Sequence, residues 1–198
     1  MEVKIGSLIQ FGEYNWRVLD VQGDKALIIT EDVVEERKYH EKYVDITWEM
    51  CDLRKYLNSE FLDKFDKDKI ILTDNKNPDN LWYGTKGGND TQDKIFLLSL
   101  EEVDYYFGNS GDYTSMKRKK YDNGKFLPDN NGYCFSNTHD SNRLANFNDK
   151  ACWWWLRSPG LYSFLAAYVY EDGIVFVSGL SVNRNRGGGV RPALWLKL

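Results

Sequence analysis

The sequence predicts an α+β domain built from short antiparallel strands, flanking helices and long loops. Alternating apolar side chains separated by glycine turns fill the first thirty positions, which is typical of a strand meander. Between residues 48 and 66, apolar side chains recur at spacings of three and four, as on one face of a helix. An apolar segment at 190–196 predicts a last strand. Because the chain has 198 residues and is 42% hydrophobic, we expect one domain with a substantial core.

The first strands are expected at residues 5–11, 14–21 and 25–30, with a turn at 22–24. In the second, Trp16 and Val18 face one way while Arg17 and Leu19 face the other. Strand 190–196 has no partner nearby in sequence, so its backbone groups must pair at long range. We expect it to join the N-terminal strands in one antiparallel sheet, which brings the two termini close together.

Two helical regions are expected, near residues 48–66 and 100–107. Thr47 can cap the first, and Ser59 can cap a second piece after an interruption at residues 58–59. The other helix begins at Ser99, which has capping-box spacing to Glu102, and ends at Gly108 in a left-handed cap. Residues 94–98, just before it, predict a short buried strand.

Two polar stretches, residues 74–93 and 109–131, are interpreted as long surface loops over one core. The second contains the basic run 117–120, which is more typical of a solvated face than of a phosphate site. The net charge of −4 and the pI of about 5.3 argue against a general nucleic-acid-binding protein. The longest apolar runs are too short to span a membrane, and the first residues lack the apolar region of a signal peptide.

The cysteines and histidines predict no metal site and no disulfide framework. Cys51, Cys134 and Cys152 are odd in number and widely spaced, and His40 and His139 lie far apart. We expect three reduced thiols, no metal and no cofactor. Reduced thiols favour synthesis in the cytoplasm, and the localisation otherwise stays open, since display on a virion or cell surface is compatible with them.

Motifs for catalysis are weak. The triplet at residues 139–141 reads His-Asp-Ser, but the Gly-x-Ser-x-Gly elbow is missing. The glycine-rich runs at 84–88 and 187–189 have neither P-loop nor dinucleotide-binding spacing, and are interpreted as turns. The expectation is therefore a protein that is not an enzyme.

Three adjacent tryptophans occupy residues 153–155. On an extended chain they cannot all face one way. Core anchors with one sheltered surface ring are expected, in preference to a platform that stacks on sugars.

Residues 161–186 alternate two kinds of position. One set is small or plain: Ser163, Ala166, Ala167, Val169, Asp172, Gly173, Val175, Gly179 and Val182. The other set is chemically mixed: Leu161, Tyr162, Phe164, Leu165, Tyr168, Tyr170, Glu171, Ile174, Phe176, Val177, Leu180, Ser181, Asn183, Arg184, Asn185 and Arg186.

We expect a three-residue hairpin loop at 171–173, with Gly173 in the left-handed region. The register of this hairpin shows which residues of the two sets share a face. Its register places Val169 opposite Val175 on an inward face. Tyr168, Tyr170, Ile174 and Phe176 then share the other face. If that face is open to solvent it is an aromatic patch of the kind that marks binding sites; if a sheet or loop covers it, these are core residues.

The ending of the chain resembles a large uncharacterised domain family of Firmicutes and their phages. The resemblance rests on residues 154–160 (WWLRSPG), on 166–169, on 172–173 and on 189–194 (GVRPAL). It extends to 14–19, 53–58 and 96–99, and so covers most of the chain. In its ending that family is similar to C-type-lectin-fold proteins, including the variable proteins of diversity-generating retroelements and the formylglycine-generating enzymes.

The resemblance implies a single C-type-lectin-like domain over residues 1–198. It also implies a hypervariable, ligand-binding region at 161–186, whose mixed positions fall where adenine-directed mutagenesis acts. Asn183 and Asn185 would be unchanged template codons. The reactive cysteine pair of the formylglycine-generating enzymes and the calcium-site motifs of lectins are missing, which argues against those activities.

The expected function is therefore binding of a macromolecular ligand, a protein or a glycan, with no nucleic-acid partner. Two alternatives stay open. One is an enzyme of the same fold group, with its site around His139 or Cys152. The other is a constant assembly domain whose 161–186 face is buried against another part of the polypeptide or an oligomer, and the oligomeric state is open.

Overall fold

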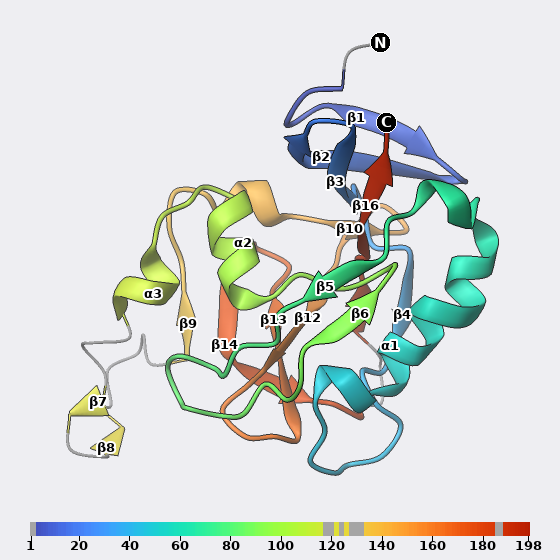
Figure 1. The fold of residues 1–198 in the computed structure, drawn as a ribbon. Helices are drawn as coiled ribbons and strands as arrows, with labels where there is room; N and C mark the ends of the chain where they lie inside the picture. The colour runs from blue at the N-terminus through green and yellow to red at the C-terminus, as the bar shows by residue number, and fades with distance from the viewer. Residues whose placement is uncertain (1–2, 117–120, 123–124, 127–132, 185–187) are drawn as a thin grey trace.

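Two sheets organise the fold, and helices and long connections surround them (Figure 1). The computed structural model describes residues 3–116, 121–122, 125–126, 133–184 and 188–198. It is a mixed α+β structure, as predicted. The strands of the two main sheets are β1 (Leu8–Phe11), β2 (Tyr14–Gln22), β3 (Lys25–Thr30), β4 (Glu35–Arg37), β9 (Cys134–Phe135), β12 (Trp154–Pro159), β13 (Leu165–Val169), β14 (Val175–Ser181), β15 (Gly188–Val190) and β16 (Ala193–Lys197).

The helices and the small strand pairs lie in the connections. The helices are η1 (Trp48–Met50), α1 (Asp52–Tyr56), η2 (Leu57–Phe61), η3 (Leu62–Lys64), η4 (Lys67–Lys69), α2 (Leu100–Tyr106), α3 (Asp112–Met116) and η5 (Asp140–Arg143). The two-stranded pairs are β5 (Thr73–Asn75) with β6 (Thr91–Asp93), β7 (Tyr121–Asp122) with β8 (Lys125–Phe126), and β10 (Asn146–Phe147) with β11 (Lys150–Ala151).

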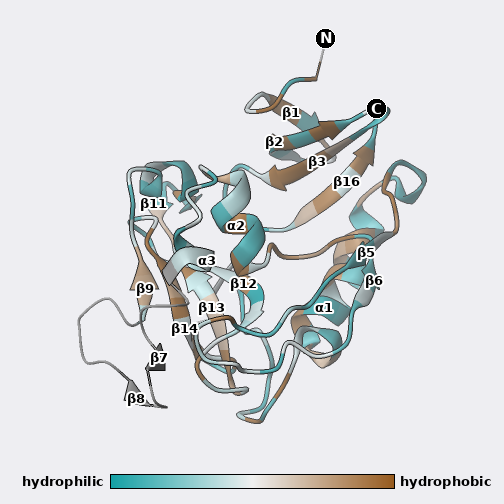
Figure 2. Ribbon diagram, turned by 60° about the vertical axis from the view of Figure 1, so that its left-hand side comes forward, coloured by the Kyte–Doolittle hydropathy of each residue, from teal (hydrophilic) through white to brown (hydrophobic). Residues whose placement is uncertain are grey.

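The first sheet has the strand order β1-β2-β3-β16, and all its pairings are antiparallel. Ala193 pairs with Ile29 and Lys197 pairs with Lys25. The predicted long-range pairing of the last strand with the N-terminal strands is therefore confirmed, and Figure 1 shows β16 beside β3. Figure 2 shows hydrophobic colour along β3 and β16, the two strands that form this pairing.

The predicted strand 190–196 is divided between the two sheets. Val190 belongs to β15, which pairs with β4 and β12, whereas β16 begins at Ala193. The break falls at Arg191 and Pro192, because proline has no N–H to donate to a ladder. The buried Arg191 guanidinium donates to the backbone oxygens of Thr30 and Glu31, each at 2.9 Å, and so ties the break to the end of β3.

The second sheet has the order β4-β15-β12-β13-β14-β9, with β12 near its centre. Every residue of β12 is buried, including Trp154 and Trp155 at 0% exposure. Trp153 is partly exposed, so the expectation of core anchors with one sheltered surface ring is confirmed. Gly188 is required where β15 passes these rings, because a Cβ there would lie 2.3 Å from the Trp155 indole nitrogen.

The first helical region runs from η1 to η4 without the predicted interruption. Thr47 makes no side-chain cap; instead the Cys51 thiol accepts a hydrogen bond from the Arg54 backbone N–H at 3.4 Å and caps α1. Ser59 lies inside η2, where the backbone has π-helical hydrogen bonding, and its hydroxyl donates to the Lys55 carbonyl at 2.7 Å. Serine bonded back to the preceding turn can stay within a helix, which explains why Ser59 starts no second piece.

The capping box predicted for α2 is present. Glu102 N–H donates to the Ser99 hydroxyl at 3.2 Å, and Ser99 N–H donates to the Glu102 carboxylate at 2.8 Å. Gly108 follows the helix with a positive φ of 140°, as expected for a residue that ends it. Residues 94–98 form no strand; residues 95–98 are buried, and Phe96 makes an isolated bridge to Ala193.

The polar stretch 74–93 is not the surface loop that its composition predicts. Its two ends pair as β5 and β6, and Asn75, Asn77, Asn80 and Asp93 are buried. The Asn80 amide donates to the carbonyls of Pro159 and Val177, at 2.8 and 3.2 Å, so its polarity is used to satisfy backbone groups inside the fold. In the stretch 109–131, α3 is a short helix, and the basic run 117–120 lies outside the described residues.

Candidate functional site

The hairpin that joins β13 to β14 has the predicted register. Tyr168 pairs with Phe176 and Val169 pairs with Val175, and the Tyr170 N–H donates to the Ile174 carbonyl at 2.8 Å. Gly173 has a φ of 87°. A Cβ at Gly173 would also lie 1.9 Å from the Asp140 carbonyl oxygen, so both the turn and the packing against η5 require glycine.

The two faces of this hairpin differ in burial, with one departure from expectation. Val169 and Val175 are fully buried, as predicted. On the other face Tyr170 is 38% exposed, and Ile174 and Phe176 are partly exposed. Tyr168, expected to be solvent-accessible, is only 6% exposed.

Neighbouring rings bury Tyr168. Its ring stacks on Phe176 at 4.9 Å between centroids and meets Trp153 edge-on at 5.4 Å. Tyr170 meets the rings of both Tyr168 and Phe176 edge-on, at 6.4 and 5.8 Å. The outer face is therefore a layer of four rings in which Tyr170 is the exposed end.

The other mixed positions vary in exposure. Val177 is fully buried, because it faces the core two residues after Val175, and this corrects its placement on a solvent-facing surface. Asn185 and Arg186 lie outside the described residues. Three mixed residues besides Tyr170 are exposed: Tyr162, Glu171 and Arg184. Six more, besides Ile174 and Phe176, are partly exposed: Leu161, Phe164, Leu165, Leu180, Ser181 and Asn183.

An open pocket of about 680 Å³ lies beside the ring layer. Tyr170, Glu171 and Arg184 bring three mixed positions to it, and the Arg184 guanidinium lies over the Trp153 ring at 5.8 Å. The remaining wall comes from β4 and from the β10–β11 hairpin: Glu36, Phe147, Asn148, Lys150, Ala151 and Cys152. The pocket thus combines aromatic surface with carboxylate, guanidinium and ammonium groups, a set suited to a ligand with both apolar and charged parts. We call it the hairpin pocket.

A second aromatic group lies outside the hairpin pocket. Tyr162 stacks on Phe164 at 5.3 Å, and Phe164 contacts Tyr43 at 5.0 Å. Tyr43 and Tyr162 are 58% and 54% exposed. Five of the mixed positions therefore belong to these two sites: Tyr170, Glu171 and Arg184 line the hairpin pocket, and Tyr162 and Phe164 belong to this exposed ring cluster.

Sequence reasoning missed the parts of the site that lie outside 161–186. Glu36 and Lys150 reach the hairpin pocket from distant segments, and Tyr43 reaches the ring cluster from the connection after β4. Their neighbourhood depends on the pairing of β15 with β4, which no local pattern reveals. The one local signal for Tyr43 in the sequence is its place beside Val44 in a charged segment. Both side chains are exposed in the structure.

Burial governs the titration of the Cys152 thiol and of the Tyr168 hydroxyl. It raises the pKa of the Cys152 thiol to about 11 and that of the Tyr168 hydroxyl to about 12. Cys152 is therefore a neutral thiol near pH 7, whereas a nucleophilic cysteine needs a lowered pKa.

The His139-Asp140-Ser141 triplet is used for structure. The Asp140 carboxylate forms an ion pair with the buried Arg143, accepts a hydrogen bond from the Ser136 hydroxyl, and accepts another from the Asn137 N–H at 3.0 Å. His139 packs against Gly108, whose Cβ position would lie 2.3 Å from the imidazole. These contacts fix η5 beneath the hairpin turn.

In the described part of the chain, no group of three or more histidine, cysteine or acidic side chains is arranged to hold a metal ion. The helices of the same part are too short or too polar for any of them to cross a membrane.

Comparison with known proteins gives one match. Neither a curated protein nor a solved structure matches the chain. A family model described as "Domain of unknown function (DUF6273)" matches residues 23–198, which include both sheets from β3 onward and the whole hairpin pocket. The chain belongs to the DUF6273 domain family.

Proposed function

We propose that the domain binds a macromolecular ligand, a protein or glycan surface, through the residues of 161–184 that line the hairpin pocket and form the exposed ring cluster. The observation that carries this proposal is the convergence of Tyr170, Glu171 and Arg184 beside Trp153 on one open pocket. Tyrosine, tryptophan and arginine are the residues that most often dominate binding energy at interfaces.

The rigidity of the platform supports the proposal. Tyr170 stands on stacked rings and above two buried valines, so its orientation is set before a ligand arrives. Binding then costs little side-chain entropy. The plain positions Ala166 and Ala167 are buried too, which matches a division into a constant scaffold and variable outer positions.

We further propose that the scaffold is C-type-lectin-like and that the mixed positions are diversified by a retroelement. The pairing of β16 with β3, and the central place of the WWLRSP strand β12, are in keeping with such a scaffold. Because Val177 is buried, a change there would alter the core and not the ligand contacts.

Two observations together test the proposal. The DNA flanking the gene should carry a reverse transcriptase and a near-identical repeat rich in Asn codons. Deep sequencing of the locus in a population should find substitutions concentrated at the exposed mixed positions. A locus with neither feature, and with invariant codons, would remove the diversification half of the proposal.

Binding is tested with a glycan array and a displayed peptide library as probes. A selected probe should lose at least tenfold in affinity with Tyr170→Ala or Arg184→Ala, corresponding to about 1.4 kcal/mol each. Tyr105→Ala is the matched control, because Tyr105 is 60% exposed on α2. Equal losses from Tyr105→Ala and Tyr170→Ala would contradict the site. A dimer that Tyr170→Ala dissociates would favour the assembly domain instead.

A further inference from the structure

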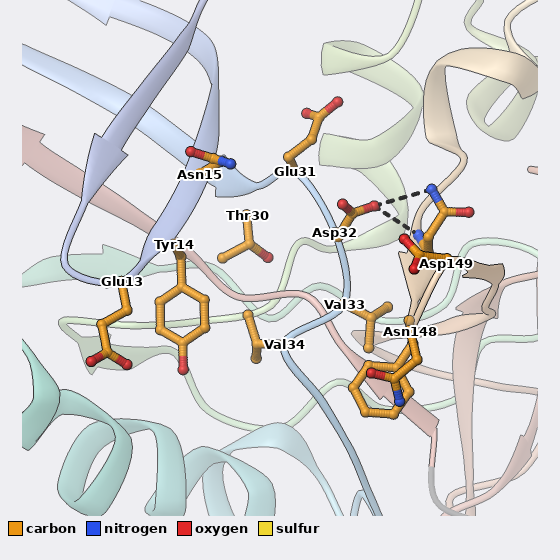
Figure 3. Close-up of a pocket in the computed structure, with 12 residues that line it drawn as sticks. Glu13, Tyr14, Asn15, Thr30, Glu31, Asp32, Val33, Val34, Asn148 and Asp149 are labelled. Carbon is orange, nitrogen blue, oxygen red and sulfur yellow. Dashed lines mark hydrogen bonds between the residues drawn. The ribbon is translucent and has the colours of Figure 1, made fainter.

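A second pocket, of about 490 Å³, lies beneath the turn between β1 and β2 (Figure 3). Its walls come from three segments: residues 13–15, residues 30–34 at and after the end of β3, and the β10–β11 hairpin. It contains none of residues 161–186. We call it the acidic pocket.

The walls of the acidic pocket are held together by hydrogen bonds. Asp32 accepts from the Asn146 N–H and side-chain amide, at 2.9 and 3.3 Å, and Val33 N–H donates to the Asn146 carbonyl at 2.9 Å. Figure 3 shows Asp32 with its dashed hydrogen bonds on one side of the pocket and Glu13 with Tyr14 on the other. Its shape is therefore formed in advance of any ligand.

Charge in this pocket is of one sign. Four carboxylates line it, and none of its lining residues is basic: the acids are Glu13, Glu31, Asp32 and Asp149. Glu31 is neutralised by an ion pair with Arg17. The buried Arg191 guanidinium does not line the pocket; it donates to the backbone carbonyls of Thr30 and Glu31 and interacts electrostatically with Glu31 and Asp32. Within the described residues, Glu13, Asp32 and Asp149 form no ion pair.

An unused hydroxyl accompanies the acids. Thr30 is 1% exposed and lines the pocket, and its hydroxyl oxygen has no hydrogen-bond partner among the described residues. Figure 3 places its side chain between Tyr14 and Asp32. A buried hydroxyl without a partner costs free energy, which an N–H donor from a ligand would recover.

Apolar surface completes the pocket. The rings of Tyr14 and Phe147 and the side chains of Val33 and Val34 line it together with the acids. Aromatic faces attract organic cations, and the valines suit an alkyl stem. A bare metal ion would need converging ligands, and in the described residues these acids form no such group.

We propose that the acidic pocket binds an organic cation, a guanidinium or primary ammonium group on a short alkyl stem. The carboxylates of Glu13, Asp32 and Asp149 supply the charge, Tyr14 and Phe147 supply the ring faces, and the Thr30 hydroxyl accepts one N–H. The acidic pocket shares Phe147 and Asn148 with the hairpin pocket, but it contains none of Tyr170, Glu171 and Arg184, on which the proposed function rests.

The probes are N-acetyl-arginine amide and N-acetyl-lysine amide, measured by titration calorimetry, with N-acetyl-citrulline amide as the neutral match for arginine. We expect saturable binding of the cations, weakened by salt, and none of citrulline. Free arginine identifies the source of the cation. If its extra carboxylate weakens binding, the ligand is a side chain of a protein; equal or tighter binding indicates a free metabolite.

Variants locate the site. Asp149→Asn and Glu13→Gln should each weaken cation binding about fivefold. Asn tolerates the left-handed φ of 62° at residue 149, so the turn is preserved. Asp68→Asn, an exposed acid in η4 outside both pockets, is the control for net charge.

Thr30→Val separates binding from folding. It should weaken cation binding yet leave the melting temperature unchanged or raised, because it removes a hydroxyl without a partner. Tyr170→Ala and Arg184→Ala should not affect cation binding, which keeps this test separate from that of the proposed function. Equal binding of citrulline and arginine, no saturable binding at millimolar concentrations, or equal effects of Asp149→Asn and Asp68→Asn would overturn the proposal.

Discussion

The rings of Tyr168 and Phe176 stack across β13 and β14, with centroids 4.9 Å apart and 9° between their planes. The pair joins the layer that presents Tyr170 to solvent, while Tyr168 itself is covered by Trp153. Two tyrosines two residues apart, on the same face of the hairpin, therefore have different roles: Tyr168 in β13 supports the platform, and Tyr170 just after β13 lies at its exposed end.

Truncating these two tyrosines should have unequal effects on stability. Tyr168→Ala should lower the free energy of unfolding by about 3 kcal/mol, because it leaves a cavity between packed rings. Tyr170→Ala should lower it by less than about 1 kcal/mol, as at an exposed position. Urea unfolding followed by tryptophan fluorescence measures both. Equal losses would mean that Tyr170 is a core residue and would remove the physical basis of the binding surface.

The inward face of the hairpin should not tolerate charge. Val169→Asp places a carboxylate at a position with 0% exposure, so the domain should be unfolded or lose at least about 3 kcal/mol. Val169→Ala, which only removes methyl groups, should cost about 2 kcal/mol and keep the fold. Circular dichroism melts of the two variants give the comparison. A folded Val169→Asp protein with a normal melting temperature would contradict the burial of this face.

The buried Arg157 should make Glu102 a sensitive position. The Arg157 guanidinium donates to both carboxylate oxygens of Glu102, one at 2.9 Å, and to the Leu97 carbonyl at 2.7 Å. Glu102→Gln keeps the capping box but leaves the guanidinium without its counter-charge, which should cost about 3 kcal/mol.

Glu101→Gln is the matched control, because Glu101 is exposed on the same turn of α2. It should change the free energy of unfolding by less than about 0.5 kcal/mol. If both variants melt together, the Arg157–Glu102 pair contributes nothing to stability.

The two buried thiols should be protected in the native protein. Burial raises the pKa of Cys51 to about 12 and that of Cys152 to about 11. Both stay protonated near pH 8 in the fold, so a disulfide reagent should modify them only after denaturation, when three thiols titrate. Without denaturant, rapid modification of Cys51 in both the parent protein and the Cys152→Ser variant would contradict this.

The pKa of Cys51 also sets the sign of an alkaline effect. Its thiol ionises near 9 when unfolded and near 12 when folded, so the fold favours the protonated form. The stabilisation is complete below pH 9 and is lost as the pH rises toward 12. Cys51→Ala should therefore reduce the alkaline fall in stability, measured by urea unfolding between pH 8 and about 10.5.

Local patterns in the sequence were sufficient for elements whose determinants lie within a few residues. The hairpin register follows from Gly173 and its alternating neighbours, and the start of α2 follows from Ser99 and Glu102. The thiol cap at Cys51 was missed because oxygen acceptors are the usual caps, and Thr47 offered one. Pro192 was the available signal for the division of the last segment, since proline is rare inside central strands.

Long-range burial was beyond any local pattern. Asparagines and aspartates in the stretch 74–93 have a loop-like composition, yet Asn80 and Asp93 are buried because distant carbonyls, the Arg54 guanidinium and the Trp48 indole need partners there. The hairpin register predicts that Tyr168, Tyr170 and Phe176 share one face. It does not predict the residue that covers Tyr168 or the charged wall of the hairpin pocket, because these come from distant segments. Trp153, Glu36 and Lys150 meet that surface only once the second sheet is assembled.

The division of the last segment at Arg191 and Pro192 has a consequence for how the chain folds. Arg191 lies 161 residues after its partner Thr30, and β16 lies still later in the chain. The pairing of β3 with β16 therefore cannot form until nearly all of this sequence has been synthesised. Until then β3 is an edge strand of the first sheet, and the second sheet lacks β15 between β4 and β12. Such late, high-contact-order closure makes folding slow and leaves the nascent chain prone to association, so its yield in a cell should depend on chaperones that shield open strand edges.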